Sequence, residues 1–319
     1  MTTPLLQVQE LCKYYKAPRG QTLKAVNHVS FSVYPGETLG IVGESGCGKT
    51  TCGKTCMGML RPTGGQVLYR GKNIHTMTRR ERFAHTSQAQ MIFQDPYSSL
   101  DPRQTVYGIL AEGIRIHKRA SSRAQEQQMV AQLLEQVGLA PHHALRSISE
   151  FSGGQRQRIG IARALSVEPE FLFCDEPVSA LDVSVQAQII NLLTRLQQQR
   201  HLTMLFVAHD LAIVKHISHR IAVMYLGHLV ELAPCHNLYK TPAHPYTQAL
   251  LAAVPIPDPE IARQPKGTIL SGELPSSLDT PKGCPFVTRC PQCTSRCHTQ
   301  MPSLKQINPG HFVACHLYP

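Results

Sequence analysis

The stretch Gly43-Glu44-Ser45-Gly46-Cys47-Gly48-Lys49-Thr50 decides the fold of this 319-residue chain. Two glycines with four residues between them, followed by Lys and Thr, form the pattern of a phosphate-binding loop. The apolar run 38–42 precedes it with the composition of a buried strand, and a predicted helix starts after it. Strand, glycine loop and helix in that order place backbone N–H groups at a positive helix end. The stretch therefore predicts a site for the phosphates of a nucleotide.

Each residue type in this loop has a physical role. Glycine is needed because the backbone takes a positive φ and passes close to the anion. Lys49 is expected to reach the β- and γ-phosphates, and Thr50 to hold Mg²⁺. The predicted nucleotide-binding residues of this region are Gly43, Ser45, Gly46, Gly48, Lys49, Thr50 and Thr51.

Composition limits the classes of partner. The chain is 42% hydrophobic and carries a net charge of +11. This charge leaves three options open: nucleic acid, an anionic membrane surface, or Lys and Arg scattered in solvent. The absence of any run of five or more basic residues disfavours nucleic acid. No stretch approaches about 18 apolar residues and no secretory signal is visible, so we expect a cytoplasmic protein without a membrane span.

A second glycine motif, Phe151-Ser152-Gly153-Gly154-Gln155, stands at a predicted helix start. Ser152 and Gln155 have the spacing of a capping box. The adjacent glycines also leave backbone N–H groups able to face an anion. Two interpretations follow, a helix cap alone or a second anion-binding helix end. Arg156 and Arg158 either line that end or are solvated.

Polar side chains follow three apolar strands of the predicted sheet. Asp175 and Glu176 end the strand 171–174, at the edge where open α/β sheets bind ligands. Asp175 is suited to hold Mg²⁺, and Glu176 to polarise the attacking water. The alternative is an ordinary strand end with acidic surface residues. Gln94 ends another strand and is a candidate ligand for Mg²⁺ or water, while His209 follows a third.

Taken in order, these motifs resemble the ATP-binding subunit of an ABC transporter. The resemblance covers residues 5 to about 250, and one departure is Phe151, where Leu is commoner in the family. It implies that Tyr15 stacks on adenine, with Tyr14 the alternative. It also implies nucleotide contacts from Asp182, and a switch role for His209.

The resemblance also implies a fold. We expect an α/β P-loop NTPase with a mostly parallel sheet, an antiparallel β subdomain and a helical subdomain at about 100–165. The ATPase domain is expected over 1–255 and a cysteine-rich extension over 256–319, with a linker at about 255–270.

Three further segments narrow the family to the dipeptide/oligopeptide importer ATPases. They are Met91-Ile92-Phe93-Gln94-Asp95-Pro96, His244-Pro245-Tyr246-Thr247-Gln248-Ala249-Leu250-Leu251 and Ser271-Gly272-Glu273-Leu274-Pro275. The first continues through residues 97–102, and the third, with the Arg-Gln-Arg that follows residue 155, resembles the second, F-type subunit of the pair. Nickel importers are close relatives, and so the solute is open between peptides and nickel.

Family membership implies a mechanism and partners. ATP lies between the phosphate loop of one subunit and residues 152–155 of a homologous ATPase paired head to tail. Two membrane permease subunits and an extracytoplasmic peptide-binding protein complete such an importer, with the ATPase on the cytoplasmic face of the membrane. The rival functions are a soluble ABC-type ATPase in repair or translation and a non-hydrolysing regulatory module. The single phosphate loop and the intact Glu176 and His209 disfavour both.

Five cysteines crowd the last 36 residues of the chain. Soft thiolate sets select Zn²⁺ or iron–sulfur clusters. A zinc site would typically show paired C-x₂-C units, and only Cys290 and Cys293 form one. The wider spacing resembles the C-terminal element of the peptide-importer ATPases, which implies a [4Fe–4S] cluster on Cys284, Cys290, Cys297 and Cys315. Cys293 is then a spare or replaces one of these four, and the alternatives are zinc and plain or oxidised thiols.

Overall fold

The computed structural model describes residues 3–253, 278 and 280–318. The chain forms two compact units. The first comprises Met1–Val33, Glu37–His75 and Ala208–Pro319, and the second Tyr34–Gly36 and Thr76–Val207. The expected linker and the segment 271–275 lie outside the described residues.

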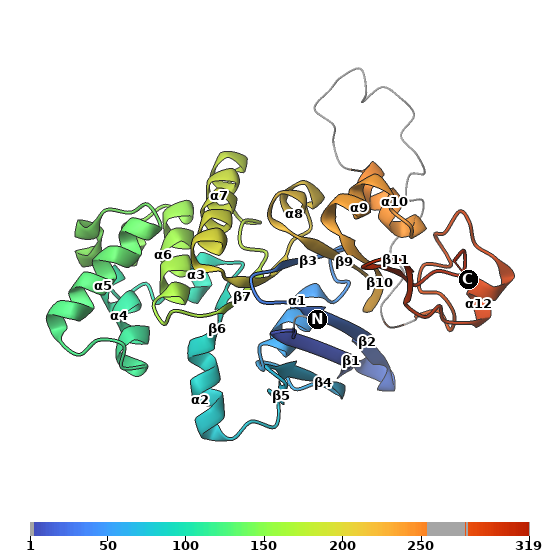
Figure 1. Ribbon diagram of the computed structural model, residues 1–319, viewed down its shortest axis with the longest axis horizontal. Helices are drawn as coiled ribbons and strands as arrows, with labels where there is room; N and C mark the ends of the chain where they lie inside the picture. Colours follow the sequence, from blue (N-terminus) through green and yellow to red (C-terminus); the bar gives the residue numbers. More distant parts are fainter. Residues whose placement is uncertain (1–2, 254–277, 279, 319) are drawn as a thin grey trace, which may run out of the picture. The chain divides into compact units, whose positions relative to one another are not determined.

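The first unit contains an antiparallel sheet at the N-terminus of the chain (Figure 1). Its strand order is β2-β1-β4-β5. The bounds are β1 Leu6–Lys16, β2 Thr22–Val33, β4 Gly64–Tyr69 and β5 Lys72–Asn73. Apolar side chains of β1 and β2, among them Leu6, Val8 and Phe31, fill the core on one face. Buried and half-buried residues alternate along much of both strands, which shows that one face of this sheet is covered and the other is partly open to solvent.

The same unit holds the strand that leads to the phosphate loop. Strand β3 (Thr38–Val42) is buried along its whole length and pairs parallel with β9 (Arg220–Tyr225). Antiparallel partners follow in the order β9, β10 (His228–Pro234), β12 (His311–Val313), β11 (Lys305–Asn308). The last two strands thus join the cysteine-rich segment to the sheet that contains β3. The helices of this unit are α1 Lys49–Cys56, α8 Leu211–Ile217, α9 Cys235–Lys240, α10 Pro245–Ala252 and α12 Ser295–Thr299.

The second unit combines a parallel sheet with a group of helices. Strands β8 (Thr203–Val207), β7 (Phe171–Asp175) and β6 (Ala89–Ile92) pair in parallel, and β7 and β8 are entirely buried. Helices α4, α5 and α6 pack against one another (Figure 1). The helix bounds are α2 Arg79–Gln88, α3 Pro96–Ser99, α4 Val106–Ile116, α5 Arg123–Gln136, α6 Gly153–Leu165 and α7 Val183–Arg200. The predicted α/β class, antiparallel sheet and helical region are confirmed.

Candidate nucleotide site

The phosphate loop, residues 43–50, connects β3 to α1 in the order that the sequence predicts. Gly48 precedes the helix with a φ of 101°, a left-handed value that favours glycine. A Cβ on Gly48 would collide with the carbonyl oxygen of Ala25, and one on Gly43 with that of Met224. Both glycines are therefore required by the backbone packed against the loop as well as by its curvature.

Lys49 is buried at the start of α1. Its Nζ donates to the carbonyl oxygens of Gly43 at 2.8 Å and Glu44 at 3.0 Å, so that the ammonium lies across the loop. Thr50 and Thr51 complete the first turn of the helix, where backbone N–H groups favour anions. The loop combines a fixed cation with a positive helix end, which suits a phosphate chain.

The two tyrosines near the end of β1 differ in their contacts. The hydroxyl of Tyr14 donates to Oδ1 of Asn27 at 2.5 Å. The ring of Tyr15 instead lies 4.9 Å from Nζ of Lys13. Because the Tyr14 hydroxyl is engaged within the sheet, Tyr15 is the better candidate to stack on a base, and this role stays a prediction.

Gln94 and Glu176 lie together in the second unit. Nε2 of Gln94 donates to Oε2 of Glu176 at 3.0 Å and to Oγ of Ser179 at 3.3 Å. Glu176 follows the buried Asp175 with a φ of 44°. Its N–H still bonds to the carbonyl of Val207 on the neighbouring strand, at 3.0 Å. The strand thus ends in a left-handed turn that presents the carboxylate beside the glutamine amide.

The capping box at the start of α6 is confirmed. The N–H of Gln155 donates to Oγ of Ser152 at 3.4 Å, and the N–H of Ser152 donates to Oε1 of Gln155 at 3.0 Å. Gly153 and Gly154 form the first two residues of the helix. Ser152 itself is exposed, so its hydroxyl can reach a second molecule while it caps its own helix.

Neither arginine after this motif is merely solvated. The guanidinium of Arg156 donates to the carbonyl of Phe151 at 2.8 Å and lies 4.2 Å from the ring centroid of Tyr97. Arg158 donates to the carbonyl of Val137 at 2.6 Å. Both side chains therefore fasten the helix to its own unit.

Asp182 and His209 occupy exposed positions at element ends. Asp182 precedes α7 in the second unit. His209 belongs to the first unit and stands between the end of β8 and Asp210, whose carboxylate accepts the N–H of Ala212 and caps α8. The loop, Tyr15 and His209 thus lie in one unit, and the other residues of the predicted nucleotide site lie in the second unit.

Sequence reasoning missed the residues that hold Glu44, the second residue of the loop. The N–H of Glu44 donates to the hydroxyl of Tyr246 at 2.9 Å. Its carboxylate receives two hydrogen bonds from Arg289, at 2.8 and 3.1 Å. The sequence points to Tyr246, because this residue lies in the family segment 244–251. It does not point to Arg289, apart from the position of this residue among the cysteines.

The described part of the cysteine-rich segment is folded and belongs to the first unit. The N–H of Cys284 donates to the carbonyl of Cys297 at 2.8 Å. Burial, with a smaller contribution from the nearby Cys297, Cys315 and Cys290, raises the pKa of the Cys284 thiol to about 12. All eleven cysteines of the chain are free thiols. Among the described residues, no group of three or more His, Cys, Asp and Glu side chains is arranged to hold a metal ion.

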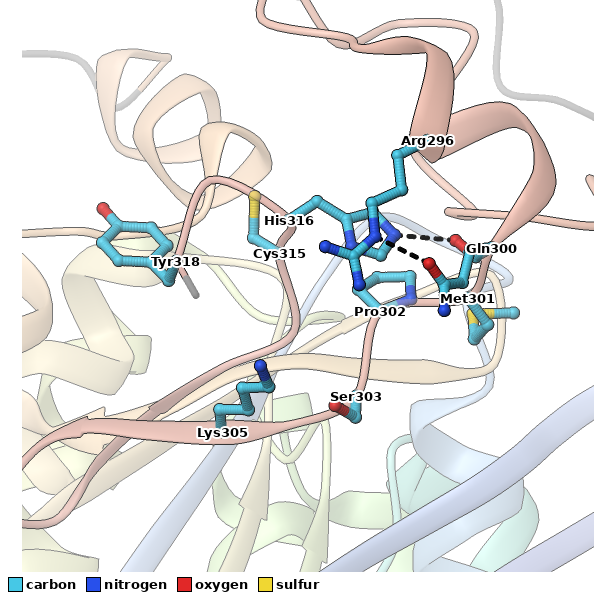
Figure 2. A pocket seen from close by; sticks show the side chains of 9 residues that line it. All are labelled: Arg296, Gln300, Met301, Pro302, Ser303, Lys305, Cys315, His316 and Tyr318. Atoms are coloured by element: carbon cyan, nitrogen blue, oxygen red, sulfur yellow. Dashed lines mark hydrogen bonds between the residues drawn. The ribbon is translucent and has the colours of Figure 1, made fainter.

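A small pocket lies beside Cys315 (Figure 2). Gln300 lines one side of the pocket. Its backbone carbonyl oxygen accepts a hydrogen bond from Nε2 of His316 at 2.8 Å, and its side-chain Oε1 accepts one from Nε of Arg296 at 2.6 Å. The remaining lining residues are Met301, Pro302, Ser303, Lys305 and Tyr318. Cys315 thus lies on the wall of a polar recess that also holds the basic side chains of Arg296 and Lys305.

The sequence matches known families and proteins over most of its length. The ABC transporter family matches residues 26–179, and the oligopeptide/dipeptide transporter C-terminal region matches residues 230–297. YkfD of Bacillus subtilis is 54% identical over 99% of this chain and 96% of its own length. The oligopeptide transport ATP-binding protein AppF of Bacillus subtilis is 49% identical, over 98% of this chain and 97% of its own.

A solved structure shares the fold. It is a dimeric post-hydrolysis state of the ATP-binding cassette MJ0796 bound to ADP and Pi. The TM-score is 0.65 at 25% identity, over 72% of this chain and 98% of the cassette. None of the helices that the structure describes is long and apolar enough to cross a membrane. The chain belongs to the family of ABC transporter ATP-binding subunits of oligopeptide import systems.

Proposed function

We propose that this chain is the F-type ATPase subunit of a dipeptide or oligopeptide importer, and that residues 43–51 bind MgATP. The observation that carries the proposal is the loop itself. Its glycines are sterically required, Lys49 lies across it, and a helix start faces it. A relative named AppF supports the F-type assignment.

Each predicted residue has a role in this proposal. Thr50, Asp175 and Gln94 hold Mg²⁺, and Glu176 polarises the water that attacks the γ-phosphate. The hydrogen bond between Gln94 and Glu176 supports their joint action, because an amide at the carboxylate orients it. His209 acts as the switch residue that senses the γ-phosphate.

The remaining nucleotide contacts come from two chains. Tyr15 stacks on adenine in the same chain, while Ser152, Gly153, Gly154 and Gln155 contact the nucleotide bound by a paired homologous ATPase. Asp182 contacts the nucleotide at the same boundary. Two permeases and an extracytoplasmic peptide-binding protein complete the importer at the cytoplasmic face of the membrane. The ATPase domain spans 1–255 and the extension 256–319.

Replacement of Lys49 tests the nucleotide site. We expect K49A to weaken equilibrium MgATP binding about 100-fold, because a charge-assisted contact to phosphate is lost. Titration calorimetry on the full chain measures this. The matched control is K240A, at an exposed lysine on α9 of the same unit. Equal ATP affinity in K49A and wild type would refute the loop assignment.

For the cysteine-rich extension we propose a [4Fe–4S] cluster on Cys284, Cys290, Cys297 and Cys315. In such a cluster each thiolate binds a different iron, so the four ligands need not converge on one point. Cys297 and Cys315 lie near enough to Cys284 and Cys290 to raise the pKa of both thiols, which supports the grouping of these cysteines. Bound there, a cluster would crosslink the extension.

Chemical analysis tests the cluster. After anaerobic purification we expect about four irons and four acid-labile sulfides per chain, with a broad visible absorption. C290S should lose both, whereas C235S, at a half-buried thiol on α9, should keep them. Stoichiometric zinc without sulfide would exclude the cluster.

A further inference from the structure

The second residue of the phosphate loop is held by the cysteine-rich extension. Nη1 and Nη2 of Arg289 donate to the two carboxylate oxygens of Glu44 at 2.8 and 3.1 Å. The Arg289 side chain is only 5% exposed and that of Glu44 25% exposed, so this is a largely buried, bidentate pair. Arg289 directly precedes Cys290, which places a residue 245 positions away in sequence against the loop.

Surrounding aromatic rings fix the arginine. Nη1 of Arg289 also reaches the hydroxyl of Tyr225 at 3.5 Å. Phe286, three residues earlier in the extension, packs against Tyr225 and Tyr246 with ring centroids 5.2 and 5.5 Å apart. All three rings are fully buried. The guanidinium is therefore positioned by a packed core, and a flexible surface contact is excluded.

Tyr246 holds the backbone of the same loop residue. Its hydroxyl accepts the N–H of Glu44 at 2.9 Å, and its ring lies 4.6 Å from that of Tyr225. Both the main chain and the side chain of Glu44 are thus fixed from one direction, by a cluster to which the extension contributes Phe286 and Arg289. The loop has less freedom than a glycine-rich segment would have alone.

The negative charge of Glu44 is the reason why its contact with Arg289 should affect nucleotide binding. The loop presents N–H groups and Lys49 to an anion, yet Glu44 adds a carboxylate beside Gly43 in the same loop. An unpaired carboxylate at that place repels a triphosphate, and low local dielectric strengthens the repulsion. A guanidinium in bidentate contact cancels that charge and also fixes its geometry.

We propose that Arg289 is a positioning residue for the nucleotide site: it neutralises Glu44 and holds the phosphate loop in its anion-binding shape. Nucleotide affinity then depends on the folded extension around Cys284 and Cys290. This inference rests on the proposed role of the loop. It assigns Arg289 no contact with the nucleotide.

A double-mutant cycle on the full chain tests the inference by MgATP affinity, with the melting temperature of each variant recorded. We expect R289Q to bind MgATP about tenfold more weakly, because the carboxylate is left unpaired beside the phosphates. E44Q should bind at least as tightly as wild type, because it removes the negative charge while its amide oxygen still accepts a hydrogen bond from Arg289. The double variant E44Q/R289Q should recover to within about threefold of wild type, since no charge remains to repel the ligand.

The rescue separates this role from a purely structural one. If Arg289 only fastened the extension, R289Q and E44Q would each lower the melting temperature, and E44Q would not restore affinity. R289K should bind ATP with intermediate affinity, because Lys supplies the charge without the fork. Wild-type affinity in R289Q, or a double variant as weak as R289Q, would overturn the proposal.

Two further outcomes are decisive. If R289Q does not fold, E44Q alone still tests the idea, because a tenfold weaker affinity in E44Q would contradict charge neutralisation. The variant K49A separates the proposed nucleotide site from the proposed role of Arg289. ATP affinity that survives K49A would refute the nucleotide site itself, whereas loss in K49A with no effect in R289Q would refute Arg289 alone.

Discussion

The phosphate loop and the start of α6 are both glycine-rich anion sites by sequence, but the protein supports them differently. The loop is held from outside, by Tyr246 and Arg289 on Glu44. The start of α6 is held by its own side chains, through the reciprocal bonds of Ser152 and Gln155, and Ser152 is exposed. The phosphate loop is therefore preorganised by contacts from other parts of its unit. The start of α6 is capped by its own side chains, and its exposed serine suits contact with a second molecule.

The largest expected effect concerns Glu176, which follows β7, and it separates ATP hydrolysis from ATP binding. E176Q should lower ATP turnover about 1,000-fold while MgATP affinity stays close to wild type, because a general base is lost and no phosphate contact is removed. Steady-state ATPase assays of the assembled transporter, with calorimetry on the full chain, give both quantities. The matched control is E135Q, at an exposed carboxylate on α5, which should behave as wild type. Wild-type turnover in E176Q would remove Glu176 from the mechanism.

Replacement of Ser152 probes the other region. S152A should lower turnover about 30-fold, the value of a hydrogen bond to a charged group, without weakening ATP binding to the single chain. The control is S122A, because Ser122 is also an exposed N-cap serine, on α5. Equal losses in S152A and S122A would reduce Ser152 to a helix cap and end the contrast between the regions.

A smaller effect is expected from pH at the support of the loop. Burial lowers the pKa of His244 from 6.5 to about 4, although Glu231 opposes this shift. The unfolded chain protonates this imidazole near pH 6.5, whereas the folded state keeps it neutral to about pH 4. The unfolded state thus binds more protons in that window, and stability falls as the pH falls, by up to about 3 kcal/mol.

Denaturant titrations between pH 7 and 4 measure this slope. H244N keeps an acceptor for the N–H of Tyr246 and should reduce the slope, of which part remains because burial also lowers the pKa of His228 to about 4. H236N, at an exposed histidine on α9, should follow wild type. A slope unchanged by H244N would show that the support of the loop does not titrate as argued.

Local motifs predicted much of this architecture. The strand, glycine loop and helix around Lys49 follow from a pattern in which each fixed residue has a steric or electrostatic reason. The capping box of Ser152 and Gln155 follows from three-residue spacing. Buried strands such as β3 and β7 are continuous apolar runs, which parallel sheets produce.

Long-range partners were beyond the reach of sequence. Glu44 occupies a position where the loop pattern accepts any residue, and its partner Arg289 lies 245 residues away. Nothing in local periodicity links them, because the contact depends on how β10 and β12 bring the extension to the loop. The anchoring of Arg156 on Tyr97 is similar, since the choice between solvent and an aromatic face is made by tertiary packing.

The most direct test of the two-region account is a structure of the assembled transporter carrying E176Q and loaded with MgATP. Residues 43–50 of this chain should bind one ATP. The account predicts that its γ-phosphate is also contacted by a different ATPase subunit, through the residues that correspond to 152–155. Ser152 of this chain should in turn reach the nucleotide of that subunit. A nucleotide enclosed by the loop and Ser152 of the same chain, or Ser152 facing away from every nucleotide, would contradict the account.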